Sequence, residues 1–320
     1  MVKNKQNRGV FKPKMEKAKK LSSGVKNFLF DIARGIAIGI AFIIPGFSGG
    51  SIAAILGIYE RLISAIADIF KDFKNSVKTL FPVGLGMVIG VVALLFPLSF
   101  ALEKFPIPTV SLFVGLAIGG MPSITDRVSG ERISYRNIIA LTVPLLIVIA
   151  ISFMPIGADK NLTSLSFGGY VLLFLIGLLS SSALVVPGIS GSMLLLILGY
   201  YNPIVNLITD HLLAGKDVAV SILVLGATAL GIAVGFILIS VIMKFLLKNY
   251  PRATYFAIIG FIVGSVPTIY ISTVKEAGMT LKTLPASPLH WIMCVLLLAI
   301  GFFISYSLVL YSRKHASKED

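Results

Sequence analysis

The stretch Ile-Pro-Gly-Phe-Ser-Gly-Gly-Ser at residues 44–51 interrupts one apolar segment, and Val-Pro-Gly-Ile-Ser-Gly-Ser-Met at residues 186–193 interrupts another. Both copies contain Pro-Gly-x-Ser-Gly, at an offset of 142. Further along, GLAIGGMPSI at residues 115–124 matches GFIVGSVPTI at residues 260–269, at an offset of 145. Chance does not explain two matches in the same order, so the chain consists of two related halves.

The composition indicates a membrane protein. Of the 320 residues, 56% are hydrophobic and 13% are charged, with a mean hydropathy of +0.94, whereas soluble domains are about 45–50% apolar. Apolar runs recur from Phe28 to Tyr311, and several reach the roughly 20 residues that a spanning helix needs. We therefore predict an all-α polytopic membrane protein.

Each half contains five apolar segments. In the first half they are residues 28–44, 50–70, 79–102, 107–124 and 137–156, and in the second half residues 168–186, 191–209, 218–246, 253–272 and 289–311. Because five is odd, the second half enters the membrane from the opposite side, as in the inverted repeats of many transporters. The predicted organisation is a tail at residues 1–27, repeat one at 28–156, an inverted repeat two at 157–311 and a cytoplasmic C-terminus at 312–320.

Charge predicts the orientation. The tail holds nine of the 28 Lys and Arg residues and one acid, Glu16, and this composition predicts a disordered cytoplasmic segment. The predicted cytoplasmic stretches together hold 22 Lys and Arg, and the outer stretches hold five. We therefore expect a multi-pass protein of the cell membrane with both termini in the cytoplasm. The tail accounts for much of the basic charge, so anionic membrane lipids are expected partners and nucleic acid is not.

The leading pair of segments in each half has two interpretations. Between Arg34 and Pro45 lie only ten uninterrupted nonpolar residues, and runs of about 10–14 are typical of re-entrant segments. We therefore predict a re-entrant helical hairpin and three spanning helices in each half. The counterpart arm, Gly168 to Val186, is long enough to span, so a fully spanning pair is the alternative.

The two Pro-Gly breaks are candidate anion sites. Proline ends the first arm of each hairpin, and Ser48 and Ser190 are placed to cap the second arms. The helix start then offers free N–H donors and the positive end of its dipole to a phosphate. The predicted phosphate cradle consists of Gly46, Ser48, Gly49, Gly50, Ser51, Gly188, Ser190, Gly191 and Ser192. The alternative is that Pro-Gly only kinks two spanning helices and the small residues allow close packing.

Few charges lie near the membrane segments. Arg34 and Asp31 share one face of the first arm, where Arg34 could bind an anionic headgroup or form an interfacial ion pair. Glu60 and Arg61 close the first hairpin, and their equivalents in the second half are uncharged. Arg61 is a candidate for attracting the anion. Glu60 is a candidate proton carrier, with a solvated loop charge as the alternative.

Catalysis is not predicted. The single cysteine, Cys294, cannot form an intramolecular disulfide, and the three histidines are scattered without metal-ligand spacing. Hydrolysis of a lipid phosphate needs a nucleophile and acid–base groups close together, but the membrane segments contain hardly any carboxylate. We expect no enzyme activity, no bound metal and no cofactor.

Residues 44–51, followed by Leu-Gly-Ile-Tyr-Glu-Arg-Leu-Ile at residues 56–63, resemble the signature of the PopT family of polyprenyl-phosphate translocases. Residues 186–192 with Leu-Gly-Tyr-Tyr at 198–201 resemble its second motif, and the resemblance covers about residues 28–311. It implies a flippase that returns undecaprenyl phosphate from the outer to the inner leaflet for envelope synthesis. Many members have Asp where this chain has Phe42, so a mechanism that needs that carboxylate is in doubt here.

Two other functions compete with the lipid flippase. A secondary transporter of a small soluble anion could use the same cradle with an enclosed pathway. A membrane scaffold without transport activity is the third hypothesis, although the chain offers no large soluble interaction domain.

Overall fold

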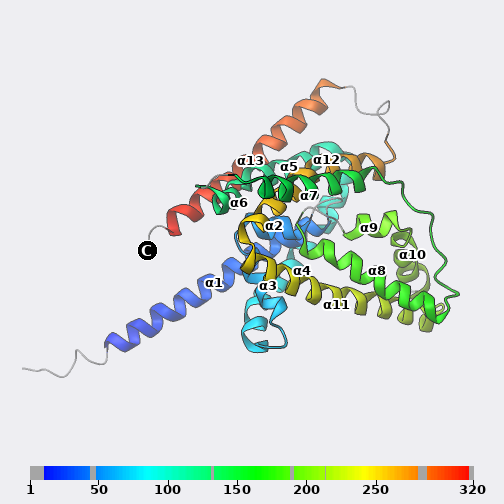
Figure 1. Cartoon of the computed structure of the whole chain (residues 1–320), viewed down its shortest axis with the longest axis horizontal. Helices are drawn as coiled ribbons and strands as arrows, with labels where there is room; N and C mark the ends of the chain where they lie inside the picture. Colours follow the sequence, from blue (N-terminus) through cyan, green and yellow to red (C-terminus); the bar gives the residue numbers. More distant parts are fainter. Residues whose placement is uncertain are drawn as a thin grey trace, which may run out of the picture.

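The computed structural model describes residues 11–43, 48–130, 133–187, 191–212, 214–279 and 287–316, in which every regular element is helical (Figure 1). The first half contains α1 (Phe11–Ile43), α2 (Gly49–Ile55), α3 (Tyr59–Ala67), α4 (Phe73–Lys104), α5 (Pro106–Gly120), α6 (Pro122–Thr125), the 3-10 turn η1 (Asp126–Val128) and α7 (Tyr135–Phe153). The second contains α8 (Phe167–Val185), α9 (Gly191–Ile197), α10 (Tyr201–Asn206), the π-helical turn η2 (Leu207–Leu212), α11 (Val218–Asn249), α12 (Pro251–Glu276) and α13 (Pro288–Ala316).

Six helical stretches in the described ranges are long and apolar enough to cross a membrane. They are α4, Pro106–Val128, α7, α11, most of α12 and most of α13. Three lie in each half, where the sequence predicts spanning helices. The predicted all-α polytopic class is therefore confirmed.

The second arm of each hairpin is a broken helix, which the apolar pattern did not predict. α2 and α9 each have seven residues, and each is followed by a glycine with positive φ, +70° at Gly57 and +76° at Gly199. The amide of Ile58 donates to the carbonyl of Ala53 at 3.0 Å, and Tyr200 repeats this bond at 2.9 Å. These are Schellman caps, which end a helix and favour glycine. They explain why Leu-Gly recurs at the same offset in both halves.

Helix pairing is duplicated between the halves. α1 packs on α4 in the first half, and α8 packs on α11 in the second. The next pairings cross between the halves, because α5 packs on α13 and α12 packs on α7. In chain order, α1, α4, α5 and α7 of the first half correspond to α8, α11, α12 and α13 of the second. Each of these helix pairs therefore has an equivalent pair. The arrangement agrees with two related halves, and their inversion across the membrane stays a prediction.

Glycines allow the close approach at these interfaces. A Cβ added at Gly35 of α1 would lie 2.1 Å from a carbonyl oxygen of α4, and one added at Gly86 of α4 would lie 2.1 Å from a carbonyl oxygen of α1. Gly115 on α5 and Gly260 on α12, 145 residues apart, would each place a Cβ 2.0 Å from a carbonyl of the partner helix. Small residues let membrane helices gain dispersion contacts that lipid cannot replace.

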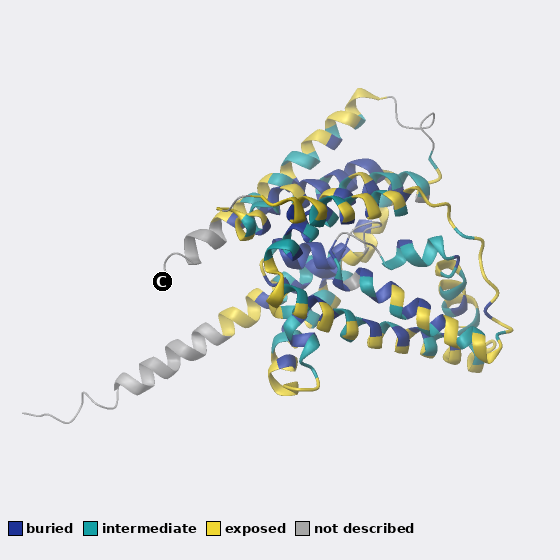
Figure 2. Ribbon diagram, in the orientation of Figure 1, coloured by how far each residue is buried: buried dark blue, intermediate teal, exposed yellow. Residues whose placement is uncertain are grey.

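The most buried helices lie at the centre of the molecule. In the apolar windows of Pro106–Val128 and α12, 67% and 56% of the residues are buried, against 17–22% in the other four spans. Figure 2 shows buried residues gathered around α2 and α5, with exposed residues on the outer helices. Apolar side chains that remain exposed on the outer helices suit contact with lipid.

The basic tail includes the start of α1. This helix begins at Phe11, before the first apolar segment, and residues 1–10 lie outside the described part of the chain, so the predicted disorder of the tail stays a prediction. Extending an existing helix costs much less than nucleating a new one, and the lysine-rich sequence contains good helix formers. The backbone therefore continues the helix beyond the point where its apolar pattern starts.

Candidate functional site

The first chain break is capped by Ser48. Its backbone is extended (φ −114°, ψ 130°), and its side chain accepts a hydrogen bond from the amide of Gly50 at 3.2 Å. This is the N-cap geometry predicted from the motif. The first arm ends at Ile43, and α2 begins at Gly49. The two arms of the first hairpin are therefore separate helices on either side of the break.

The two breaks meet in the interior of the protein. The hydroxyl of Ser48 lies 3.3 Å from the carbonyl oxygen of Ala183 and 3.5 Å from that of Val186. The hydroxyl of Tyr59 donates to the carbonyl of Val185 at 2.9 Å. These carbonyls lie at the C-terminal end of α8, directly before Pro187, where the C=O groups have no N–H donors within the helix. Hydroxyl groups of the first half therefore complete the helix end at the second break.

The predicted cradle is only partly within the described residues. Gly46, Gly188 and Ser190 lie outside them, so their predicted roles stay predictions. In the first copy Gly49, Gly50 and Ser51 are buried, and the Ser51 hydroxyl is buried with no hydrogen-bond partner among the described residues. In the second copy Gly191 and Ser192 are half-buried. An unpaired buried hydroxyl is costly, so Ser51 leaves a free polar group next to the first break.

Phe42 lies against the start of α2. A Cβ added at Gly49 would come within 2.7 Å of the Phe42 ring. Glycine at position 49 therefore makes room for the aromatic side chain.

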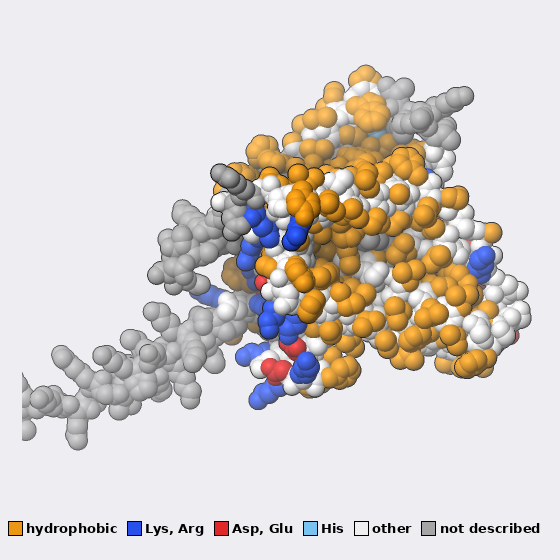
Figure 3. Space-filling model, viewed as in Figure 1, with side chains coloured by type: hydrophobic (Ala, Val, Ile, Leu, Met, Phe, Trp, Pro, Cys, Tyr) orange, Lys and Arg blue, Asp and Glu red, His pale blue; other side chains and the backbone are white. Residues whose placement is uncertain are grey.

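Two of the three predicted charge partners, Arg34 and Arg61, bind the same carboxylate. Asp31 is 7% exposed, and its carboxylate binds Arg34 at 3.1 Å and Arg61 at 2.5 Å. Arg61 therefore connects α3 to α1. A second ion pair, between Asp68 and Lys244, joins the end of α3 to α11 of the other half. Lys and Arg side chains gather at the end of the molecule that carries α3, whereas the rest of the visible face is mostly hydrophobic (Figure 3).

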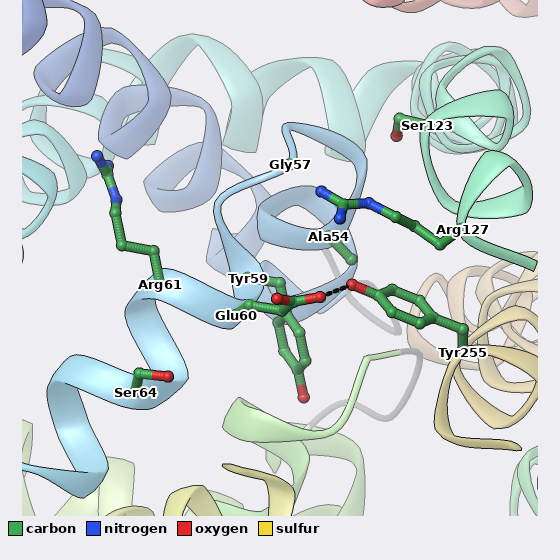
Figure 4. A pocket seen from close by; sticks show the side chains of 9 residues that line it. All are labelled: Ala54, Gly57, Tyr59, Glu60, Arg61, Ser64, Ser123, Arg127 and Tyr255. Atoms are coloured by element: carbon green, nitrogen blue, oxygen red, sulfur yellow. Dashed lines mark hydrogen bonds between the residues drawn. The ribbon is translucent and has the colours of Figure 1, made fainter. Parts of the chain in front are cut away.

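A polar cavity of about 350 Å³ lies beside the tip of the first hairpin. Its lining comprises Ala54, Gly57, Tyr59, Glu60, Arg61, Ser64, Ser123, Arg127 and Tyr255. Tyr255 donates a hydrogen bond from α12 to the carboxylate of Glu60, and Arg127 extends into the cavity from η1 (Figure 4). The cavity thus combines both halves. No group of three potential metal ligands occurs among the residues that the structure describes.

Sequence reasoning identified Glu60 and Arg61 but missed Arg127, Ser123 and Tyr255. No short motif contains these three residues, because they lie on α6, η1 and α12, and only tertiary packing brings them to the hairpin. The repeat gives one weak indication that Ser123 belongs to this site. Ser123 and Thr268 occupy the same position in the matched Pro-[Ser/Thr]-Ile stretches, and Ser123 donates to the carbonyl of Ile55 on α2 at 2.7 Å.

An apolar groove of about 310 Å³ lies beside the second break. It is lined by Val186, Pro187, Met243, Leu246, Tyr250, Ala253, Thr254, Ala257, Ile258 and Phe261. Two features connect it to the polar cavity. Thr254 in the groove precedes Tyr255 in the cavity, and Val186 in the groove follows Val185, which accepts the hydrogen bond from Tyr59.

The tip of the second hairpin is covered, in contrast to the first. The amide of Lys160 donates to the carbonyl of Gly199 at 3.0 Å, and the side chain of Asn202 donates to Asp159 at 3.2 Å. A Cβ added at Gly199 would lie 2.1 Å from a carbonyl oxygen of this connection, whereas one added at Gly57 would meet nothing within 4 Å. The link between the halves therefore closes the second tip, and the first opens to the cavity.

Comparison with known proteins gives a consistent family. The model of a family described as undecaprenyl phosphate translocase-like matches residues 38–283. A polyprenyl-phosphate transporter of Staphylococcus aureus is 32% identical over 284 residues, which cover 87% of this chain and 95% of the relative. A polyprenyl-phosphate transporter of Vibrio cholerae is 26% identical, with 91% and 98% covered. No solved structure matches the chain. The match over most of the chain shows that this protein belongs to the undecaprenyl phosphate translocase-like family.

Proposed function

We propose that this protein transports polyprenyl phosphate across the cell membrane, returning undecaprenyl phosphate from the outer to the inner leaflet for reuse in envelope synthesis. The observation that carries the proposal is the contact between the two chain breaks, from Ser48 to the end of α8. Broken backbone at membrane depth is tolerated where it is buried in protein or lines a wet cavity. Two breaks in contact supply polar groups at the centre of an otherwise apolar molecule, where a phosphate must cross.

The phosphate cradle predicted from the motif is part of this proposal. Ser51 supports it, because its buried hydroxyl has no partner and is free to donate to an anion. The donors of Ser48, Gly49 and Gly50 are occupied or buried as the site stands. We therefore expect the phosphate to enter the cradle only when the contact between the Ser48 hydroxyl and α8 opens.

The apolar groove favours a lipid over a small soluble anion. A soluble anion needs an enclosed polar path, and a groove beside the second break would contribute nothing to its binding. An isoprenoid chain, in contrast, can pack in such a groove and gain dispersion contacts with its apolar lining. The groove and the polar cavity are both lined from α12, by Thr254 and Tyr255 respectively, and this arrangement suits one amphiphile with its head and tail in different surroundings.

The direction of transport follows from the predicted orientation. If the charged end is cytoplasmic, the open polar cavity faces the inner leaflet and the covered tip of the second hairpin faces outward. An anion released into the cavity would meet the basic residues at that end. Proton coupling through Glu60 remains part of the proposal, and comparing transport by wild type and Glu60→Gln with and without a pH gradient tests it.

A liposome assay tests the transport function. Undecaprenyl phosphate is incorporated into both leaflets, and a phosphatase added outside hydrolyses the lipid that it can reach. With the protein present we expect hydrolysis to proceed to completion, because lipid from the inner leaflet keeps arriving. A plateau equal to that of protein-free vesicles would refute transport. Undecaprenyl phosphate loaded into one leaflet of vesicles with known protein orientation gives the direction.

The role of the cradle is tested with Ser48→Ala combined with Ser190→Ala. We expect the double variant to transport at least about tenfold more slowly, because each lost hydrogen bond to a charged group is worth about 1.5–3 kcal/mol. Ser99→Ala is the matched control, since Ser99 is exposed on α4 away from both breaks. If the double variant is folded and transports as fast as the control, the cradle proposal is wrong.

A further inference from the structure

The polar cavity beside the first hairpin contains an arginine that neither the motif nor the contact between the breaks uses. We infer that Arg127 binds the phosphate group of the substrate in this cavity, as a second phosphate site separate from the cradle. The inference rests on the proposed function, because the phosphate is that of a polyprenyl lipid. It adds a residue and a place on the pathway that the repeated motif does not contain.

The polar groups of the cavity suit an anion. Its lining includes Arg127 and one carboxylate, Glu60, together with Arg61, which is paired with Asp31. The Glu60 carboxylate already accepts a hydrogen bond from Tyr255. A cation would therefore find one carboxylate that is already engaged, and a phosphate would find a guanidinium within reach. Guanidinium groups bind phosphate in bidentate geometry, which makes arginine well suited to this role.

Arg127 is the available arginine of the two. Arg61 is held 2.5 Å from Asp31, which turns its side chain toward α1 and away from Arg127 (Figure 4). For Arg127, no carboxylate of the described chain lies within ion-pair distance. In Figure 4 its guanidinium lies between Gly57 and Ala54, in the same cavity as Glu60 but without an ion pair to it.

The cavity also has room for a ligand. Its volume of about 350 Å³ lies within the range of roughly 300–1,000 Å³ that small-molecule sites occupy. Gly57 contributes to this space, because a side chain at that position would project where no atom lies within 4 Å. The Schellman cap at Gly57 therefore both ends α2 and keeps the wall of the cavity bare.

The position of the cavity places it on the path of the phosphate. α2 begins directly after Ser48 and ends before Gly57, and seven helical residues span about 10 Å. The cavity therefore lies one short helix away from the first break. Tyr59 also connects the two sites, since it lines the cavity and donates to Val185 at the end of α8. A phosphate leaving the break would reach Arg127 next.

The experiment compares Arg127→Gln with Arg136→Gln in purified full-length protein in nanodiscs. Both variants remove one positive charge, and both arginines are exposed, but Arg136 lies at the start of α7 against Tyr135. The probes are undecaprenyl phosphate, undecaprenol without a phosphate, and inorganic phosphate. Binding of each probe is measured at the same ionic strength, since charge effects at a distance depend on salt.

We expect Arg127→Gln to weaken binding of undecaprenyl phosphate about tenfold, the lower end for a lost hydrogen bond between charged groups. Arg136→Gln should weaken it less than about twofold, because the more distant charge is screened. Neither variant should change binding of undecaprenol. Equal effects of the two variants would overturn the inference, and so would an equal loss of undecaprenol binding in Arg127→Gln.

The outcomes separate this inference from the proposed function. If wild type and Arg127→Gln bind and transport the lipid equally, Arg127 has no such role and the transport function stands. If Arg127→Gln loses binding of inorganic phosphate while wild type binds no lipid, the cavity is an anion site and the lipid proposal is wrong. If wild type binds neither probe, both proposals are wrong.

Discussion

Two glycines on α4 provide the sharpest test of the duplicated helix packing. A Cβ added at Gly86 would lie 2.1 Å from the carbonyl oxygen of Ile32 on α1, and one added at Gly84 would meet nothing within 4 Å. Gly86→Ala and Gly84→Ala make the same chemical change two residues apart on one helix. The first forces a methyl group into the interface with α1, and the second leaves that interface untouched.

The magnitude follows from the geometry. Real Cβ atoms essentially never approach another atom closer than 3.0 Å, so α1 and α4 must separate by at least about 0.9 Å (3.0 minus 2.1). Overpacking of this kind costs about 1–3 kcal/mol. Both variants gain about 1 kcal/mol from replacing glycine by alanine in a helix. The difference in stability between them is therefore the packing cost, about 1–3 kcal/mol, with Gly86→Ala the less stable.

Unfolding of the purified variants in one detergent measures this difference. About 1 kcal/mol corresponds to roughly 2–4 °C in the unfolding midpoint of a chain of 150–250 residues, so the midpoints should differ by several degrees. Gly231→Ala and Gly226→Ala on α11 form the equivalent pair, with a Cβ 2.0 Å from a carbonyl of α8 and with open space, respectively. Equal midpoints within either pair would refute the packing.

Three further predictions concern the site. Tyr59→Phe leaves the buried carbonyl of Val185 without its side-chain donor and should lower the free energy of unfolding by about 1–3 kcal/mol; an unchanged unfolding midpoint would contradict this contact between the halves. Ala257→Phe should fill the apolar groove and weaken binding of undecaprenyl phosphate at least about tenfold, as expected from losing two or more buried CH₂ groups, while binding of inorganic phosphate stays unchanged; equal losses for both probes would argue against a tail site. Asp31→Asn deprives its two arginine partners of their carboxylate and should destabilise the protein by about 1–3 kcal/mol. Glu103→Gln, at an exposed ion pair, should leave the unfolding midpoint almost unchanged, and similar effects of the two variants would show that burial of Asp31 does not matter.

Hydropathy predicted the spanning helices well, because contact with lipid requires long apolar runs wherever a helix crosses. The six candidate spans occur where the sequence placed them, three in each half. The capping role of Ser48 was also predictable, since it depends on neighbouring residues alone. Local structure was therefore predictable from the sequence where the interacting residues lie within one helical turn of each other.

Features that depend on distant residues were not predictable. The break after α2 had a local signal in Gly57, but an apolar run with one glycine also fits a continuous helix, and the choice depends on the cap. Arg127 and Tyr255 are 128 residues apart, so only the packing of α12 against the first half brings them to one cavity. The start of α1 at Phe11 could not be placed from the sequence, because composition does not show where an existing helix stops.

The crossed pairing of α5 with α13 and of α12 with α7 has a consequence for the origin of the chain. A single half would leave α5 and α7 with faces whose partners are supplied by the other copy. Before the duplication, such a half could have folded only as a homodimer that exchanged these helices. Fusing the two copies removed the dependence on concentration that every dimer carries. It also freed the copies to diverge, so that the cavity could acquire Glu60 and Arg61 on one side while the equivalent residues became Asn202 and Pro203.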